Sequence, residues 1–294
     1  MTALERRYRR LLLAYPRTYR SAHGDELIDL LLDTAPPART LPEPREAAGL
    51  IIGGLALRAK SATQGSPWTD GLHLGLTGLM AANLAALLPY ARAVPVWTAM
   101  CALALLAVMR GKALLALPLV LLTGAKAVSI AHGGQLFEAT LLPVDPTFLT
   151  DKALYGDAGT IVVMTTYALT AFGLLALAIR GNTRRTRSWW WLVTVPIAAW
   201  QGPAWLSEDS FYTPSLSKLA LELSLLALAV WAGHQTRDPR WGLGAAIYLL
   251  VTSAAVGQHA TELTQQHLAY WGLLVLMTAA TALAPYGYRR RALR

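Results

Sequence analysis

Five ionisable side chains lie in or beside long apolar segments, where they could form an ion pair or bind a ligand. They are Lys126, His132, Glu222, His259 and Glu262. An ionisable group at membrane depth costs free energy, so such residues mark candidate functional sites in a membrane protein. The chemistry open to them is ion pairing, proton relay and ligand binding.

Lys126 and Glu222 are predicted to lie at similar depths on different helices, so they could form a buried ion pair. In the alternative, Glu222 pairs with Lys218, one turn earlier on its own helix. The Lys126 side chain would then reach outward to the polar interface. Both arrangements remain open from the sequence.

His259 and Glu262 are three residues apart and share one helix face, so they could relay a proton or coordinate a metal. The spacing differs from His-Glu-x-x-His, and Cys101 is the one cysteine of the chain. We therefore predict no metal site and no cofactor. The sequence also lacks nucleotide-binding and nucleophile-elbow motifs, so we predict that the protein is not an enzyme. An intramembrane enzyme using His259 and Glu262 is a third alternative.

The composition is typical of a membrane protein. Of 294 residues, 54% are hydrophobic and 15% are charged, with a mean hydropathy of +0.39. Soluble domains usually carry about 25% charged residues. The N-terminal segment 1–69 holds 17 of the 43 charged side chains. The rest of the chain consists mainly of apolar runs, and only helices would satisfy their backbone groups in lipid. We predict an all-α, polytopic helical membrane protein.

About 20 apolar residues are needed for each transmembrane helix. Eight segments meet this criterion: 71–89, 94–109, 113–131, 159–179, 189–206, 215–233, 242–260 and 268–285. The longest connection, 132–158, could form an interfacial helix or a lid over the outer face.

The charges between these segments predict their orientation. With the N-terminus in the cytoplasm, the inner loops and tail hold 12 Lys and Arg, and the outer loops hold 2. This asymmetry follows the positive-inside rule and places both termini in the cytoplasm. It also explains the net charge of +9, so we predict no direct nucleic-acid binding. Arg outnumbers Lys by 21 to 5, a bias that fits a GC-rich bacterial genome and hence a bacterial plasma membrane.

The N-terminal segment predicts a small cytosolic domain of three helices. The first helix, 3–15, ends at Pro16 and places five apolar or aromatic residues on one side: Leu4, Tyr8, Leu11, Leu12 and Tyr15. The second helix, 25–33, is predicted to point Leu27, Leu30 and Leu31 inward. Pro44 opens the third helix, which runs to about Lys60. The predicted organisation is thus a three-helix domain at 1–62, a linker at 63–70, an eight-helix transmembrane domain at 71–285 and a basic cytosolic tail at 286–294.

Short motifs in this segment carry a resemblance to a known family. They are Tyr8-Arg9-Arg10-Leu11-Leu12, Tyr15-Pro16-Arg17-x-Tyr19-Arg20, His23-Gly24-Asp25-Glu26-Leu27, Arg45-Glu46-Ala47 and Gly53-Gly54-Leu55. Residues 4–60 thereby resemble a HAAS (HTH-associated alpha-helical signalling) domain, as found at the N-terminus of actinobacterial-type multi-pass membrane proteins. The resemblance implies that the module binds a PadR-like winged-helix transcription regulator and couples it to a membrane event.

Seven residues of these motifs are candidates for binding the partner: Tyr8, Arg9, Tyr15, Arg17, Tyr19, Asp25 and Glu26. In the alternative interpretation, the tyrosines belong to the core of the module. The arginines would then face anionic lipid headgroups, where each basic residue contributes on the order of 1 kcal/mol.

We therefore hypothesise an integral membrane signalling protein that couples a membrane or extracellular cue to a cytosolic PadR-like regulator. The alternative is a permease subunit that works with a separate cytosolic ABC-type ATPase. Both hypotheses place the lipid bilayer around the apolar helices.

Overall fold

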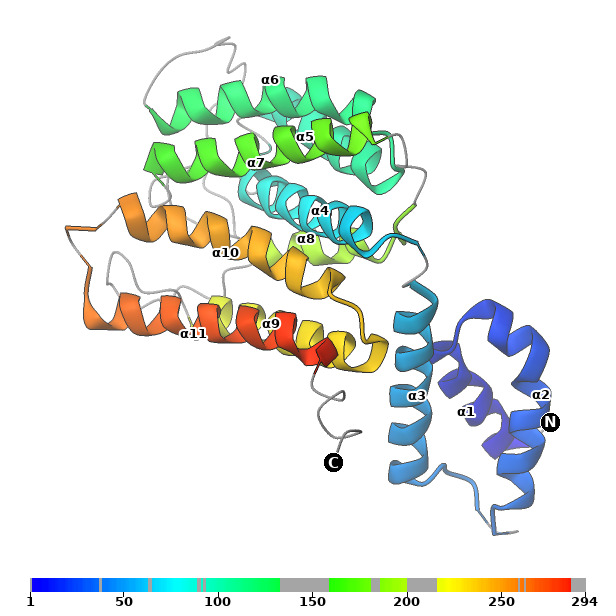
Figure 1. Ribbon diagram of the computed structural model, residues 1–294. Helices are drawn as coiled ribbons and strands as arrows, with labels where there is room; N and C mark the ends of the chain where they lie inside the picture. The colour runs from blue at the N-terminus through cyan, green and yellow to red at the C-terminus, as the bar shows by residue number, and fades with distance from the viewer. Residues whose placement is uncertain are drawn as a thin grey trace. The chain divides into compact units, whose positions relative to one another are not determined.

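A computed structural model of the chain describes residues 2–36, 39–62, 65–88, 91, 94–132, 159–180, 186–199, 216–258, 260–261 and 263–286. Within these ranges every regular element is a helix, which confirms the predicted all-α fold class there. The chain divides into two compact units (Figure 1). The first unit comprises Met1–Gly65 and His234–Asp238, and the second comprises Ser66–Gly233 and Pro239–Arg294.

The first unit contains α1 (Ala3–Leu11), a 3-10 turn η1 (Leu12–Ala14), α2 (Arg17–Asp33) and α3 (Pro44–Ala62). Thr2 begins α1 with a capping box, because its hydroxyl accepts from Glu5 N while the Glu5 carboxylate accepts from Thr2 N. Pro16 separates η1 from α2 and is the N-cap residue of α2. The second helix therefore begins at Arg17, earlier than the predicted start at residue 25.

The core of the first unit is built from residues of all three helices and of the η1 region: Leu4, Tyr8, Leu12, Tyr15, Ile28 and Leu50. Of the five predicted inner residues, Leu4, Tyr8, Leu12 and Tyr15 are buried and Leu11 is half-buried, although the α-helix ends at Leu11 and not at residue 15. The prediction for Leu30 was wrong, because this side chain is 61% exposed. Ile28 is the buried residue of α2, and Leu30 lies about 200° further around the helix.

The helices that follow are α4 (Pro67–Leu87), α5 (Pro95–Met109), α6 (Ala113–Ala131), α7 (Gly159–Ile179), α8 (Trp191–Ala199), α9 (Leu216–Thr236), α10 (Arg240–Gln258) and α11 (Gln265–Leu283), with a 3-10 turn η4 (Ala284–Tyr286) at the end. Proline opens α4 and α5, as its fixed φ angle favours in a first helical turn. Each of the eight predicted apolar segments overlaps one of these helices.

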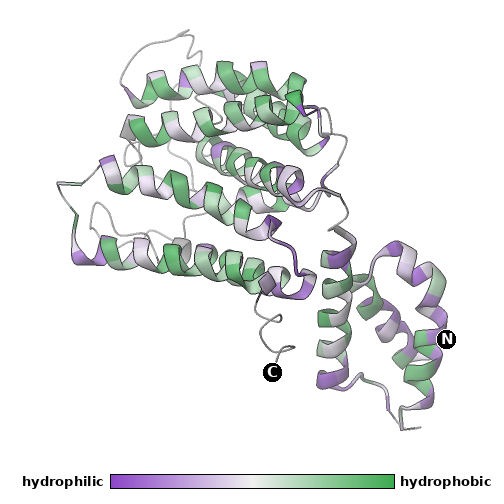
Figure 2. Ribbon diagram, viewed as in Figure 1, coloured by the Kyte–Doolittle hydropathy of each residue, from purple (hydrophilic) through white to green (hydrophobic). Residues whose placement is uncertain are grey.

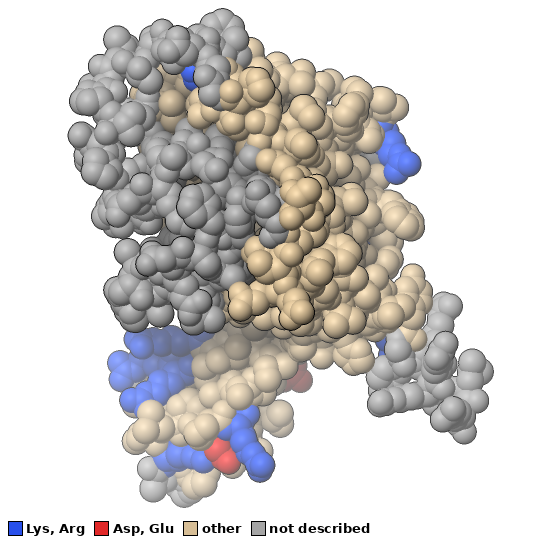
Figure 3. Space-filling model, turned by 90° about the vertical axis from the view of Figure 1, so that its left-hand side faces the viewer, with Lys and Arg blue, Asp and Glu red and all other residues tan. Residues whose placement is uncertain are grey.

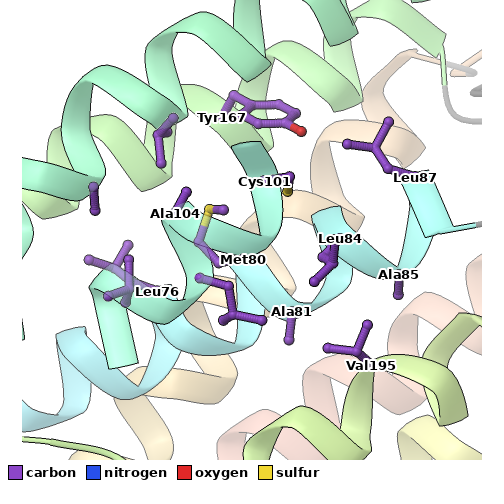
Figure 4. Packing of buried hydrophobic residues seen from close by; sticks show 14 of the residues in the cluster. Leu76, Met80, Ala81, Leu84, Ala85, Leu87, Cys101, Ala104, Tyr167 and Val195 are labelled. Carbon is purple, nitrogen blue, oxygen red and sulfur yellow. The ribbon is translucent and has the colours of Figure 1, made fainter. Parts of the chain in front are cut away.

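Helix α4 is at the centre of the second unit, because it packs against α5, α7, α8 and α10. Helix α6 packs against α5 and α7, and α10 packs against α7 and α11. Figure 4 shows Met80 of α4 beside Cys101 and Ala104 of α5, while Ala81 and Ala85 point toward Val195 of α8. The side chains of α4 thus connect two layers of helices.

Close packing of α4 against α10 depends on glycine. A Cβ atom at Gly71 would lie 3.0 Å from the Arg240 backbone, and one at Gly75 would lie 2.5 Å from Cδ1 of Ile247. A Cβ atom at Gly78 would meet no atom within 4 Å. Two of the three glycines that are spaced as a small-residue stripe on this helix therefore form the helix–helix contact.

Four helices of the described structure are long and apolar enough to cross a membrane: Ala113–Ala131, Thr160–Ile179, Arg240–Gln258 and Gln265–Tyr286. Helix α5 is also apolar but shorter. Figure 2 shows mainly hydrophobic residues along these helices and hydrophilic residues near their ends. In the view of Figure 3, Lys and Arg gather on the first unit, whereas most of the described surface of the second unit is uncharged. This distribution is compatible with the predicted membrane protein.

Candidate functional site

A buried carboxylate, Asp70 in the first turn of α4, holds two arginines in the second unit. Asp70 is 3% exposed and Arg240 is 2% exposed. The Asp70 Oδ1 atom accepts a hydrogen bond from Arg187 Nη2 at 2.8 Å, and Oδ2 accepts from Arg240 Nη1. Arg187 Nη2 also donates to the backbone oxygen of Asp70 at 2.9 Å. The result is a buried Arg–Asp–Arg ion cluster.

His73, one turn after Asp70, extends this cluster to α5. Its Nδ1 atom accepts from Arg187 Nε at 3.1 Å, so the ring proton must be on Nε2, which lies 2.7 Å from the Val108 backbone oxygen. The two contacts together fix a neutral imidazole tautomer. The Arg187 backbone N–H also donates to the Met109 backbone oxygen at 2.7 Å. The cluster therefore joins α4, α5, α10 and the segment before α8 at one end of the second unit.

Sequence reasoning missed this cluster. The first apolar segment was predicted to begin at residue 71, which left Asp70 in the linker, and the two arginines were assigned to loops. The available signal was the spacing of Asp70 and His73, which places both side chains on one face of a helix. Within the described ranges, no group of three or more His, Cys, Asp and Glu could hold a metal ion. The chemistry that the cluster supports is ion pairing between helix ends.

A second buried carboxylate, Glu222 of α9, is bound by two tyrosines. Glu222 is 8% exposed. Its Oε1 atom accepts from the Tyr248 hydroxyl of α10, and its Oε2 atom accepts from the Tyr270 hydroxyl of α11. Leu226, Ala245 and Leu274 form the neighbouring apolar core. The site thus contains one carboxylate and two phenol groups in apolar surroundings.

The structure does not bring Lys126 and Glu222 together. Lys126 is 6% exposed on α6, which lies far from α9 across the second unit (Figure 1). His132 is exposed at the end of α6. His259 and Glu262 lie outside the described residues, as does the Lys218 side chain. Of the five ionisable candidates, the structure describes Lys126, His132 and Glu222. It places against Glu222 two tyrosines that the sequence patterns did not identify.

Two of the predicted partner-binding tyrosines belong to the core of the first unit. Tyr8 is fully buried, and its hydroxyl donates to Glu46 Oε2 at 2.8 Å. Burial, followed by this hydrogen bond, raises the pKa of Tyr8. The same hydrogen bond lowers the pKa of Glu46. Tyr15 is 8% exposed and stacks on the half-buried Tyr19, with ring centroids 5.2 Å apart.

Gly54 and Arg58 of α3 contact the loop that carries Tyr15. A Cβ atom at Gly54 would lie 2.8 Å from the backbone carbon of Ala14, so only glycine permits this approach without a shift. Arg58 Nη2 donates to the backbone oxygens of Leu13 and Tyr15. The motif residues around Tyr15 and Gly54 are therefore explained by packing within the unit.

The charged candidates of the first unit are on its surface. Arg9 contacts Glu5 at 3.2 Å and Asp25 at 3.2 Å, and the side chains of Asp25 and Glu26 are 84% and 83% exposed. Arg17 is also exposed. Helix α3 adds exposed apolar side chains, with Ile51 at 41%, Ile52 at 52% and Leu55 at 44%. These charged and apolar groups are accessible to a partner.

Comparisons with protein-family models, with curated protein sequences and with solved structures find no match to this chain.

Proposed function

We propose that this protein is a bacterial plasma-membrane signalling protein with eight transmembrane helices and cytoplasmic termini. Its N-terminal unit would bind a cytosolic PadR-like transcription regulator, as the resemblance to a HAAS domain implies. The cue would be a change in the membrane or outside the cell. Support for the membrane part comes from the four apolar helices and from the asymmetry of Lys and Arg in the sequence.

The observation that carries the proposal is the position of the Asp70–Arg240 ion pair. The chain passes from the first unit to the second between Gly65 and Ser66, and again between Asp238 and Pro239. Asp70 and Arg240 follow these two crossings within a few residues, and they form a buried ion pair inside the second unit. A displacement of α4 against α10 would therefore be transmitted to two of the three chain connections between the units at once.

Such coupling is a two-state linkage. A ligand shifts the bundle between two arrangements only by its difference in affinity for them. The regulator would bind the exposed residues of the first unit, namely Arg9, Arg17, Asp25 and Glu26 with the apolar side chains of α3. Tyr8 and Tyr15 would support this surface from the core.

Co-purification in mild detergent from the native host tests the proposal. We expect a winged-helix regulator with the full-length protein and none with a variant that lacks residues 1–62. Arg17→Glu should reduce recovery about tenfold, as expected for the loss of one charged contact. Arg6→Glu makes the same charge change at an exposed position outside the motifs and should leave recovery unchanged. The proposal would be overturned if the deletion left recovery of the regulator unchanged. It would also be overturned if the deletion left unchanged the output of a transcriptional reporter under that regulator.

The buried Glu222 favours a second candidate function, a permease subunit with a separate ATPase, because charged groups inside membrane bundles often mark transport pathways. An ATPase recovered with both the full-length protein and the deletion variant would support this function. So would substrate flux in proteoliposomes that is abolished by Glu222→Ala.

A further inference from the structure

The two buried carboxylates of the second unit differ in how their charge is compensated. Asp70 contacts two guanidinium groups, so its negative charge is fully neutralised. Glu222 accepts hydrogen bonds from two neutral phenols, Tyr248 and Tyr270. Among the described residues, no Lys or Arg forms an ion pair with Glu222. The described side chains thus leave an ionised Glu222 with a net negative charge in apolar surroundings.

An uncompensated charge in such surroundings is strongly unfavourable. Hydrogen bonds satisfy the lone pairs of a carboxylate but leave its charge in place. A bound cation or a proton removes that charge. The three helices therefore favour a state in which Glu222 carries a positive counter-charge that no described side chain supplies.

We propose that Glu222, Tyr248 and Tyr270 form a binding site for an exchangeable monovalent cation, with the proton and Na⁺ as the two candidate occupants. The ligand atoms are one carboxylate and two phenolic oxygens, which suit hard cations. A phenol can rotate its hydroxyl hydrogen away and present a lone pair to a cation. A divalent ion is disfavoured, because one carboxylate neutralises only one of its two charges and the other would remain in apolar surroundings.

Further polar groups lie on α10 and α11. Trp271, next to Tyr270, donates through Nε1 to the Ser253 hydroxyl at 3.0 Å. Near the end of α10, the Oε1 atom of Gln258 is buried and accepts no hydrogen bond from the described residues. The site depends only on these three helices and not on what binds the N-terminal unit.

Carbodiimide labelling of the purified full-length protein tests the site, because dicyclohexylcarbodiimide reacts with protonated carboxyl groups in apolar surroundings. Peptide mass spectrometry locates the adduct. We expect labelling of Glu222 that falls as the pH rises, and no labelling of Asp70, the buried carboxylate that arginines neutralise. Protection by NaCl but not by choline chloride identifies Na⁺ as an occupant. Labelling that depends on pH but not on NaCl identifies the proton as the occupant.

Infrared difference spectra give a second readout that does not depend on access of the reagent. The difference between the wild-type and Glu222→Gln spectra should contain a carboxyl band that responds to acid or Na⁺. Tyr248→Phe and Tyr270→Phe should each shift the half-maximal proton or Na⁺ concentration about tenfold, since each removes a hydrogen bond to a charged group. The proposal is overturned if the Glu222 band does not respond to pH or Na⁺, or if both tyrosine variants titrate like the wild type.

Discussion

At the residue scale, the first unit depends on a hydrogen bond between a buried phenol and a carboxylate that is nearer the surface. Tyr8 donates to Glu46, which also accepts from the Glu43 backbone N–H at 3.3 Å and contacts Arg39 at 3.6 Å. The bond links α1 to the first turn of α3. Its strength depends on pH, because it requires an ionised Glu46 and a protonated Tyr8.

We expect Tyr8→Phe to lower the stability of the first unit at neutral pH, where the hydrogen bond is formed. The folded-state pKa of Glu46 is lowered, so this stabilisation is full above the unfolded pKa of about 4.3 and is lost as the pH falls through the folded value. The pKa of Tyr8 is raised, so stabilisation is full below about 10 and is lost as the pH rises through the folded value.

Hydrogen exchange of α1 and α3 peptides in the full-length protein, corrected for the intrinsic pH dependence of exchange, measures this effect. The difference in hydrogen exchange between wild type and Tyr8→Phe should disappear in acid. A difference that persists unchanged below pH 3 would show that the hydrogen bond is not its cause. Tyr8→Ala should lower the free energy of unfolding by more, about 3 kcal/mol, because it leaves a cavity in the core.

A substitution in the Asp70 cluster should likewise lower the stability of the second unit. Asp70→Asn removes the carboxylate that contacts two largely buried guanidinium groups, which should lower the free energy of unfolding by roughly 3–5 kcal/mol. Glu26→Gln removes a carboxylate at an exposed position and should change it by less than about 0.5 kcal/mol. Thermal unfolding in detergent compares the two variants. Equal melting temperatures would contradict the structural role of Asp70.

At the element scale, the contact between α4 and α10 is tested by a matched pair of glycines on one helix. Gly75→Leu places a side chain against Ile247, and such overpacking should cost about 1–3 kcal/mol or more. Gly78→Leu has room for its Cβ atom and should be tolerated. Size-exclusion profiles and melting temperatures in detergent measure both variants. If Gly75→Leu behaves like Gly78→Leu, the two helices do not pack as described.

At the scale of the whole molecule, the direction of the spans can be tested by thiol labelling. In a Cys101→Ser background, Thr261→Cys and Thr186→Cys introduce single thiols at exposed positions. A membrane-impermeant maleimide should label Thr261→Cys in intact cells. Thr186→Cys should react only after permeabilisation. The reverse pattern, or labelling of both in intact cells, would contradict the proposed orientation.

The sequence alone determined the helical class, the position of the apolar segments and the inner face of the first helix. Apolar periodicity and segment length are local properties, so they can be read without knowledge of the fold. The same reasoning misplaced the start of α2 and the direction of Leu30. The helix begins directly after Pro16, and which face of it is buried depends on how it packs against α1.

Only the tertiary structure identified the partners of the buried charges. Asp70 and Arg240 are separated by 170 residues, and Glu222 meets tyrosines 26 and 48 residues away. No local pattern encodes such pairs, because they form only where distant helices pack together. The sequence singled out Glu222 by its apolar surroundings. The fold decided that two phenols, and not Lys126, bind its carboxylate, because α6 and α9 lie on opposite sides of the second unit.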